Sequence, residues 1–381
     1  MKIKQFIAAL ATLCTTSVVS YAQPLSAYTN FQNQFMVWDN GITRKLEFLL
    51  PINYDIGRVA IPYIDNSRNF KVYYQGASQQ INTGFTSGFK ASDYLITYLN
   101  GRALFVWDEG KTKLLSANIS SYAMGDSLVV FYDEVQKMFK AYYDKETVEL
   151  ESFLGAGRPS IMFDTAVVNS EVSTSGSQLQ TIKVSDNIAG YVNYNNQFKL
   201  FYKGEIINED DYSVSSFDVG RNTAAYVNYN DQFNIFHKGK TVNAEGFKPI
   251  NYKVGDNLVA YISSDYYFKI FYEGQIYEVG YMRPEYSVAD NVVTFVDNSG
   301  YYRAFYKGQI YTLDVQAPKS VKKGYNSVAF INNSGFLKLF TAGKIYDVTS
   351  GDLTEWRLDY DVLQYRFGQN LYKVYHEGRD Y

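Results

Sequence analysis

Residues 252–314 contain one pattern twice, and this pattern decides the fold. In the first copy Tyr252-Lys253-Val254-Gly255-Asp256-Asn257 leads into Leu258-Val259-Ala260-Tyr261-Ile262. After a polar turn come Phe268-Lys269-Ile270-Phe271-Tyr272-Glu273-Gly274 and Gln275-Ile276-Tyr277-Glu278-Val279. The second copy runs from Tyr286 to Leu313 with the same order of segments. The rest of the chain is built from this unit.

An anchor residue, either aromatic or Leu, is followed six positions later by Gly or, in one copy, by Lys145. The anchors are Phe35, Phe70, Leu104, Phe139, Phe198, Phe233, Phe268, Tyr302, Leu337 and Tyr372. Successive copies are 34 or 35 residues apart, except for one step of 59. A fixed period of this size is typical of solenoids, propellers and arrays. The long step is one period plus 24 residues, which places an insertion at about residues 154–177.

Each unit is expected to form four short strands, at residues 252–254, 258–262, 268–272 and 275–279 in the first copy, which we call a, b, c and d. The position three residues after the anchor is aromatic in all ten copies, so strand c carries apolar groups on both faces. A small sheet packed on both faces has the geometry of a propeller blade. We therefore predict an all-β protein, a single β-propeller of about ten 35-residue repeats, with two smaller propellers split near the insertion as the alternative.

The ends of the chain bear on how such a ring closes. The chain begins in a b-like strand at residues 26–30 and ends in a c-like strand with its turn at residues 372–378. This arrangement suits a ring closed by strands from both termini. The Gly that follows each strand c is expected to end a two-residue hairpin, because such turns need positive φ.

Antiparallel order places the b–c turns and the d–a loops at the same end of every sheet. The d–a loops are the longest and most variable segments, and the insertion falls in one of them. Loops held by a rigid scaffold are where function usually lies. We expect the binding surface on this side of the ring.

The first segment has the pattern of an export signal. Lys2 and Lys4 precede an apolar run at residues 6–13, and Ser20-Tyr21-Ala22 supplies small residues for cleavage before Gln23. We therefore divide the chain into a signal peptide, residues 1–22, and a propeller domain, residues 23–381. Cys14 is the only cysteine, so the propeller domain would have no disulfide.

The charge and hydropathy of the chain limit its partners. Removal of Lys2 and Lys4 with the signal takes the formal charge from −3 to −5. An acidic surface argues against nucleic acid as a partner. No later apolar run reaches membrane-spanning length, so we expect no direct membrane insertion.

The sequence contains no motif for catalysis or for a metal or cofactor. His237 and His376 occupy a repeat position that is Tyr in several other copies, so we interpret them as structural aromatic substitutes. Asp186, Asp256 and Asp290 recur at the a–b turn, where Asp commonly bonds to nearby backbone N–H groups. A residue repeated in most copies is expected to shape the turn, because catalysis needs one asymmetric site. We predict no catalytic residue, no metal site and no cofactor, and hence a protein that is not an enzyme.

The b–c turns combine Tyr with Asn and Asp, which are good contact residues for proteins and for sugars. We predict a binding surface made by these turns and the neighbouring loops. Its residues are Tyr194, Asn195, Tyr229, Asn230, Asp265, Tyr266, Tyr301 and Arg283.

The repeat resembles exported bacterial β-propeller proteins over residues 26–378. The resemblance is carried by the strand that begins Asp290-Asn291-Val292 and by the hairpin that contains Phe268-Lys269 and Phe271-Tyr272. The Trp-Asp endings of WD40 blades and the Asp boxes of sialidases are missing. Propellers host enzymes as well as binding proteins, so the resemblance implies the architecture alone.

Two functions are consistent with these observations. The first is a non-catalytic exported scaffold that binds an envelope-associated protein partner through its loop-rich side. We expect it in the periplasm, because the last repeat runs almost to Tyr381, with an extracellular location as the alternative. By analogy it would be an accessory subunit of an outer-membrane secretion complex, such as a type IX translocon. The second is a carbohydrate-binding or glycan-processing propeller, which requires about three acids converging at the ring centre.

Overall fold

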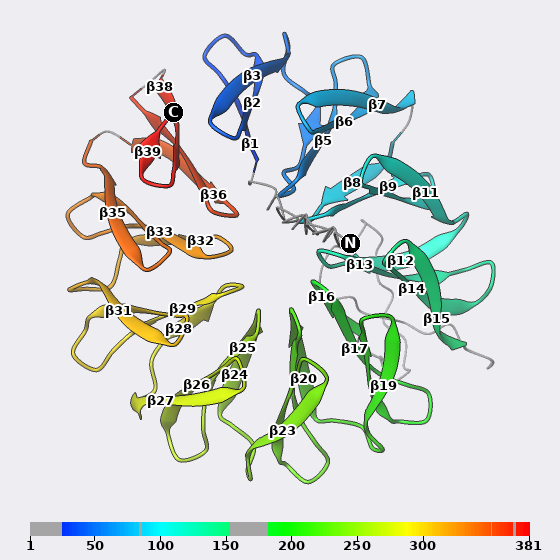
Figure 1. Ribbon diagram of the computed structural model, residues 1–381, viewed down its shortest axis with the longest axis vertical. Coiled ribbons are helices and arrows are strands. Elements are labelled where there is room, and N and C mark those ends of the chain that lie inside the picture. Colours follow the sequence, from blue (N-terminus) through cyan, green and yellow to red (C-terminus); the bar gives the residue numbers. More distant parts are fainter. Residues whose placement is uncertain (1–24, 84–85, 153–181, 352, 369–370) are drawn as a thin grey trace, which may run out of the picture.

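The computed structural model describes residues 25–83, 86–152, 182–351, 353–368 and 371–381. These residues form ten small antiparallel sheets arranged around one central axis (Figure 1). Nine sheets have four strands, and the N-terminal sheet has three. The predicted single ring of ten blades is confirmed, and the alternative of two smaller rings is wrong. The predicted signal peptide and the insertion at residues 154–177 lie outside the described residues.

The blades are numbered here from the N-terminus, and in each the strands follow one another from the axis outward (Figure 1). Blades 1–3 contain β1 (Ser26–Thr29), β2 (Phe35–Asp39), β3 (Ile42–Glu47); β4 (Asn53–Tyr54), β5 (Ala60–Ile64), β6 (Asn69–Tyr74), β7 (Ala77–Thr83); and β8 (Gly88–Ala91), β9 (Leu95–Asn100), β10 (Ala103–Asp108), β11 (Lys111–Ser116). Blades 4–6 contain β12 (Ile119–Met124), β13 (Leu128–Asp133), β14 (Met138–Tyr143), β15 (Glu146–Ser152); β16 (Ile182–Ser185), β17 (Ile188–Val192), β18 (Phe198–Tyr202), β19 (Glu205–Asp210); and β20 (Ser216–Gly220), β21 (Thr223–Val227), β22 (Phe233–His237), β23 (Lys240–Glu245). Blades 7 and 8 contain β24 (Asn251–Gly255), β25 (Leu258–Ile262), β26 (Tyr267–Tyr272), β27 (Gln275–Tyr281); and β28 (Tyr286–Val288), β29 (Val292–Val296), β30 (Tyr302–Tyr306), β31 (Gln309–Asp314). Blades 9 and 10 contain β32 (Ser320–Lys323), β33 (Ser327–Ile331), β34 (Leu337–Thr341), β35 (Lys344–Thr349); and β36 (Leu353–Asp359), β37 (Val362–Phe367), β38 (Leu371–His376), β39 (Arg379–Asp380).

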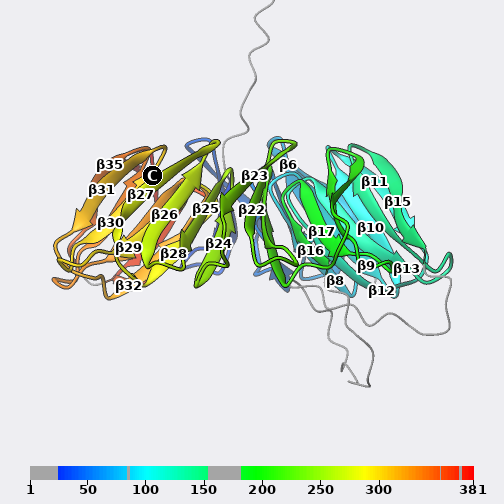
Figure 2. The same ribbon diagram turned by 90° about the horizontal axis from the view of Figure 1, so that it is seen from below.

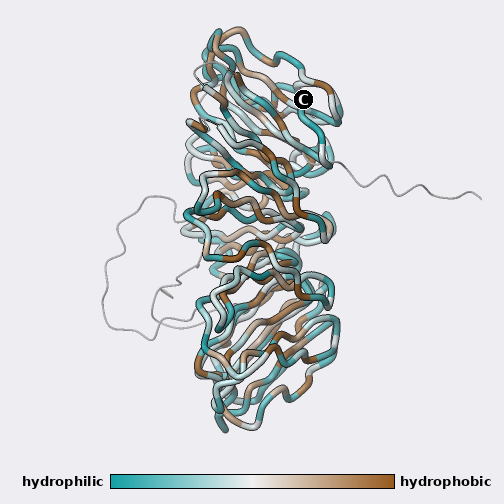
Figure 3. The backbone as a smooth tube through the Cα atoms, turned by 90° about the vertical axis from the view of Figure 1, so that its left-hand side faces the viewer, coloured by the Kyte–Doolittle hydropathy of each residue, from teal (hydrophilic) through white to brown (hydrophobic). Residues whose placement is uncertain are grey.

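The hydrophobic core lies between blades rather than inside them. One cluster joins Phe233 of blade 6 to Val259 and Phe271 of blade 7. Phe268, on the opposite face of the same strand β26, packs with blade 8. The prediction that strand c is apolar on both faces is therefore confirmed. Seen from its edge, the ring is a flat slab with apolar segments running through its thickness (Figure 3).

One aromatic contact recurs between neighbouring blades. An aromatic residue of strand a covers the anchor of the preceding blade, as Tyr252 covers Phe233 with ring centroids 5.0 Å apart. Equivalent pairs have centroids 5.0–5.2 Å apart, and each of these anchors is 0% exposed. The pairs are Phe35–Tyr54, Phe70–Phe89, Phe198–Phe217 and Phe268–Tyr286.

The two histidines belong to the same inter-blade packing. The ring of His237 meets Phe271 of the next blade edge-on at 5.4 Å, and His376 meets Trp38 at 5.2 Å. Tyr202, at the equivalent position in blade 5, meets Phe236 in the same way at 5.3 Å. The interpretation of both histidines as structural aromatic substitutes agrees with these contacts.

The junction between blades 10 and 1, which we call the seam, differs from our expectation. Blade 10 is a complete four-stranded sheet, and among the described residues no sheet combines strands from the two ends of the chain. Closure is instead made by side chains, with Trp38 of blade 1 packed on Val362 and Val374 of blade 10. Ring closure by a shared sheet was therefore wrong, because the flat apolar faces of the end blades pack directly on each other.

The c–d hairpins have the predicted turn geometry. In blade 7 both turn residues have positive φ, +47° at Glu273 and +86° at Gly274. Blade 4 has Asp144 and Lys145 in this turn, with φ of +48° and +66°. A side chain in this conformation is strained, because its Cβ crowds the following carbonyl oxygen.

We predict that Gly274→Val lowers the free energy of unfolding by about 1–2 kcal/mol. A Cβ at Gly274 would meet nothing within 4 Å, so the loss would come from backbone strain alone. Conversely, Lys145→Gly should raise the stability slightly, since it relieves the same strain. Thermal unfolding of both variants tests this, and an unchanged melting temperature for Gly274→Val would refute the turn assignment.

Candidate functional site

One side of the ring carries the b–c turns and d–a loops, meaning the segments that join β1 to β2, β3 to β4 and their equivalents in the other blades. We call this side the loop face. The a–b and c–d turns lie on the opposite side, as the antiparallel order requires, and the blades stand side by side across the thickness of the slab (Figure 2). All of the predicted binding residues lie on the loop face.

The four predicted tyrosines occur on four consecutive blades. Tyr194 and Tyr229 stand at the tips of their b–c turns and are 73% and 74% exposed. Tyr266 and Tyr301 are 40% and 38% exposed. Among the described residues, none of these four rings stacks on another. They form an arc of separate contact points rather than one pocket.

The predicted polar residues mostly build the turns. The backbone N–H groups of Asn195 and Asn230 donate to the Oδ1 atoms of Asn193 and Asn228, each at 3.0 Å. Such bonds fix the turn, and Asn195 and Asn230 are themselves exposed. The Ser263 hydroxyl donates to Asp265, which lowers the pKa of that carboxyl.

Two further tyrosines on the loop face were missed by the sequence analysis. Tyr212, in the loop after β19, packs against Tyr229 with ring centroids 5.6 Å apart. Tyr281, at the end of β27, meets Tyr266 at 6.4 Å, and the Arg283 guanidinium lies 4.8 Å from the Tyr266 ring. The aromatic residues of the d–a loops were the signal in the sequence for these tyrosines. They were missed because the tyrosines that they contact lie on b–c turns about 15 residues away in the chain.

An exposed apolar run in the loop between blades 1 and 2 was also missed. Phe48, Leu49, Leu50 and Ile52 are 73%, 57%, 46% and 56% exposed. We call residues 48–52 the apolar loop. Runs of exposed apolar residues are unusual on soluble proteins and mark interaction surfaces.

Exposed aromatic residues are concentrated on the loop face. Among the described residues, the only exposed Phe and Tyr elsewhere are Tyr94 and Tyr381. Those on the loop face are Phe31, Phe48, Tyr194, Tyr212, Tyr229, Phe247, Tyr266, Tyr281, Tyr301, Phe336 and Phe367.

A second group of residues meets at the axis, on the opposite side of the ring. Nine blades each contribute one residue from the same repeat position in the a–b turn. In blade 7 this residue is Asp256, two residues after Val254 of strand a. We call these residues the axial cluster: Arg58, Asp93, Asp126, Asp186, Arg221, Asp256, Asp290, Tyr325 and Tyr360. Five carboxyls thus face two guanidinium groups and two phenols.

Arg221 reaches across the axis to residues of several other blades. Its contacts are with Asp126 (2.5 Å), Asp186 (3.0 Å), Asp93 (3.4 Å), Asp256 (3.6 Å) and the Tyr325 hydroxyl (2.5 Å). Arg58 pairs with Asp93 at 3.4 Å, and both guanidinium groups lie about 5 Å from the Tyr325 ring. One planar cation therefore holds together turns that are far apart in the sequence.

The carboxyls of the axial cluster share protons. Burial and the neighbouring Asp186 raise the pKa of Asp126 to about 7. Burial and Asp256 raise the pKa of Asp186 to about 8, and Asp93 and Asp256 have a pKa of about 6, mainly because of burial. The Asp186 carboxyl thus favours a proton on Asp126, and the Asp256 carboxyl favours a proton on Asp186.

The expectation that Asp256 shapes its own turn was wrong. Asp256 Oδ1 accepts from the Arg221 N–H at 3.2 Å, and Asp126 Oδ1 accepts from the Asp93 N–H at 3.3 Å. These two carboxyls therefore bind the turn of a neighbouring blade. The turns also approach closely, since a Cβ at Gly255 would lie 2.6 Å from the Ala289 carbonyl oxygen. Because the turns are crowded at the axis, the side chains at this repeat position contact the turns of neighbouring blades.

Two carboxyls of the axial cluster are buried, most of its other members are half-buried, and Asp290 is exposed. Asp93 and Asp256 are each 2% exposed. Among the described residues, no group of three or more His, Cys, Asp or Glu has the arrangement of a metal site. The sequence did contain a signal for the axial cluster. At this repeat position several copies depart from Asp, and Arg221 is the clearest departure.

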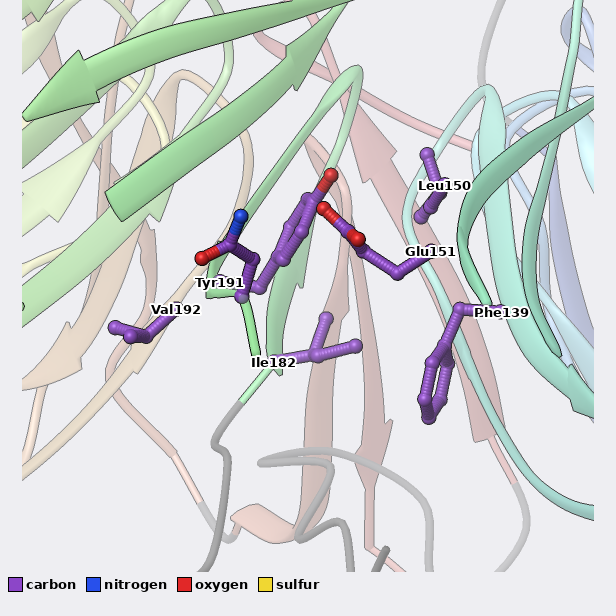
Figure 4. Close-up of a pocket in the computed structure, with 7 residues that line it drawn as sticks. Phe139, Leu150, Glu151, Ile182, Tyr191 and Val192 are labelled. Carbon is purple, nitrogen blue, oxygen red and sulfur yellow. The ribbon is translucent and has the colours of Figure 1, made fainter. Parts of the chain in front are cut away.

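A small cavity between blades 4 and 5 is too small for a ligand. It is lined by Phe139, Leu150, Ile182 and Tyr191 among others, and Tyr191 and Glu151 lie close together at its edge (Figure 4). Its volume of about 10 Å³ is that of one water molecule.

The axial cluster makes stability depend on pH. Its aspartates have native pKa values above the unfolded value near 4, so the native protein holds more protons than the unfolded chain between about pH 4 and pH 8. Stability from this source falls as the pH rises through that window. We predict that the Asp186→Asn variant has the same melting temperature as the parent at pH 5 and a higher melting temperature than the parent at pH 8.5.

Asp65→Asn is the control for this prediction. Burial acts to raise the pKa of Asp65, but hydrogen bonds from Lys71 and Asn69 outweigh this effect and lower the pKa to about 2. Its stabilising effect is present above about pH 4, so the variant should melt below the parent at both pH values. An Asp186→Asn difference that stays constant with pH would contradict shared protons at the axis.

Comparison with known proteins agrees with the architecture. A family model described as a 10-bladed beta propeller domain matches residues 19–381. Similar solved structures include the computationally designed Ika8 protein, with 14% identity over 77% of this chain and 97% of that chain and a TM-score of 0.32. Prp20p of Saccharomyces cerevisiae has 10% identity, with coverage of 84% and 81% and a TM-score of 0.32.

PorZ of Porphyromonas gingivalis, a surface component of the type-IX secretion system, has 7% identity, with coverage of 87% of this chain and 51% of that chain and a TM-score of 0.29. No curated protein matches the chain. The family model spans nearly the whole chain, and the structure has ten blades. The protein therefore belongs to the family of 10-bladed β-propeller domains.

Proposed function

We propose that this protein is a non-catalytic exported scaffold that binds a protein partner through its loop face. The observation that carries the proposal is the apolar loop, where four large apolar side chains stand exposed in one short segment. A ten-bladed propeller is consistent with a binding scaffold. Burial of such side chains is the main source of affinity between proteins.

The aromatic residues of the loop face support a protein as the partner. Tyr and Arg are enriched among the residues that dominate binding energy, and the loop face presents both, as in the Arg283–Tyr266 pair. The turns that carry the tyrosines are fixed by side-chain-to-backbone hydrogen bonds, so little conformational freedom is lost on binding.

The glycan-processing alternative required acids that converge at the ring centre, and the axial cluster is such a convergence. Four of its five carboxyls nevertheless pair with Arg221, and Asp93 and Asp256 are almost completely buried. Glycoside hydrolysis needs two carboxyls that face the scissile bond, with room for the sugar between them. This arrangement favours a structural role for the acids, and a binding role for the protein.

The proposed location is the periplasm, with the protein as an accessory subunit of an outer-membrane secretion complex. Support comes from the basic, apolar and small-residue pattern of residues 1–22. Within the described residues, no helix has the length and apolar character needed to cross a membrane. The secretion complex rests on resemblance to exported propellers.

Affinity purification of the tagged protein from its native cell envelope tests the proposal. We expect a stoichiometric protein partner whose recovery falls at least tenfold in a Phe48→Ser, Leu49→Ser variant and in a Tyr194→Ser, Tyr229→Ser, Tyr266→Asn variant. Mass spectrometry of the eluate measures the recovery.

The matched control is Ile276→Ser with Ile310→Ser. These side chains are 44% and 48% exposed but lie on the outer strands β27 and β31. The control should retain the partner. Recovery of the protein alone, or equal loss in the control, would argue against the loop face as a protein-binding surface, and glycan binding and hydrolysis would then be measured.

A further inference from the structure

Blade 1 has no described strand at the position nearest the axis, where the other nine blades have strand a. In blade 7 this strand pairs with β25, and the Ile250 N–H donates to the Ile262 carbonyl at 2.8 Å. Thr29 is the residue of β1 equivalent to Ile262. Its backbone N–H and carbonyl therefore lie on the edge of β1 that faces away from β2.

The inner half of the strand a position is occupied by side chains of blade 10. Gln364 Nε2 and Arg357 Nη2 donate to the Ala27 carbonyl, at 3.0 and 2.7 Å. In blade 5 the residue equivalent to Gln364 is Gly190, and a Cβ there would lie 3.2 Å from Phe217 in the next strand a. A long polar side chain at this position fits beside blade 1, which has no strand a among the described residues. The sequence of blade 10 is thus adapted to the three described strands of blade 1.

The outer half of the position remains a cleft of about 140 Å³ at the seam. Its walls include Tyr28 and Thr29 of β1, Trp356 of β36 and Tyr372 of β38. These residues lie toward the b–c ends of their strands or at the start of strand a, so the cleft is on the side of the loop face. We call it the seam cleft.

Tyr372 is the anchor of blade 10, and among the described residues no aromatic side chain of a strand a covers it. In five other blades the anchor is covered by an aromatic residue of the next strand a and is 0% exposed. Tyr372 is instead partly exposed, with Tyr28 stacked at 5.6 Å and the Arg366 guanidinium 5.2 Å from its ring. The seam cleft therefore has room for the aromatic side chain that the repeat pattern places there.

We propose that an extended segment of the protein partner enters the seam cleft, pairs with the Thr29 edge of β1 and packs an aromatic side chain on Tyr372. This inference rests on the proposed scaffold function and specifies its binding mode, the addition of a strand to an open sheet edge. The segment is short, because Gln364 and Arg357 fill the inner half.

The surroundings of the seam cleft favour a partner over the chain itself. Cleavage before Gln23, as the sequence predicts, leaves two residues ahead of Leu25, whereas strand a of blade 7 begins seven residues ahead of Leu258. Tyr54 lines the cleft, and Ile52 of the apolar loop is two residues away in the chain. A partner that covers the apolar loop therefore reaches the cleft.

A peptide with the protein's own strand a sequence provides the probe. Residues 248–255, with Tyr252 as the aromatic residue, are synthesised with a fluorophore. Fluorescence anisotropy measures their binding to the protein purified from its native cells. We expect saturable binding in the micromolar range, weakened at least tenfold when Tyr252 of the peptide is replaced by Ser.

Two protein variants test the two halves of the contact. Tyr372→Ser removes the aromatic surface, and Thr29→Pro removes the edge N–H without affecting a bond to β2. Each should weaken peptide binding at least tenfold while the protein keeps a cooperative thermal transition. Tyr301→Ser, on the loop face but away from the seam, is the matched control and should bind the peptide like the parent.

Binding that persists in both Tyr372→Ser and Thr29→Pro would overturn the inference. So would the absence of binding, including the case in which mass spectrometry shows that the purified protein retains residues before Gln23 and so fills the cleft itself. Recovery of a partner without peptide binding would refute this inference alone. Peptide binding without a recoverable partner would refute the scaffold function alone.

Discussion

The packing of one blade on the next is the interaction on which the whole ring depends. Each sheet is apolar on both faces, so no blade buries its core without two neighbours. An anchor covered by an aromatic residue of the next strand a repeats this contact around the ring. Because every blade needs a neighbour on each side, the end blades must meet, and the ring closes through Trp38 and its blade 10 contacts.

The local part of this architecture follows from the sequence because it depends on residues close together in the chain. Alternation in strand c, the Gly274 turn and the 35-residue period all act within one repeat. The axial cluster does not, since Arg221 meets Asp126 and Asp93 only after nine a–b turns converge on one axis. Seen in sequence, Asp256 and its equivalents are turn residues, and their mutual contact becomes visible only in the closed ring.

The candidate site divides in the same way. Tyr194 and Tyr229 were predicted because the b–c turn that exposes them is a local feature. Tyr212 and the apolar loop were missed, since exposure of an apolar residue in a long loop depends on what the next blade covers. The seam cleft was missed for a stronger reason, because it is created by the meeting of residues from opposite ends of the chain.

A ring of similar blades is nearly symmetric. Positions where one copy departs from the repeat make one part of the ring different from the others. Arg221 replaces an acid at the axis, and the resulting cation offsets carboxyls that would otherwise repel each other. Gln364 replaces a small residue at the seam and substitutes for half of a strand. Specific recognition needs a surface that differs from its symmetric copies. The loop face beside the seam, where the three described strands of blade 1 adjoin the apolar loop, is the part of this ring that differs most from the other blades.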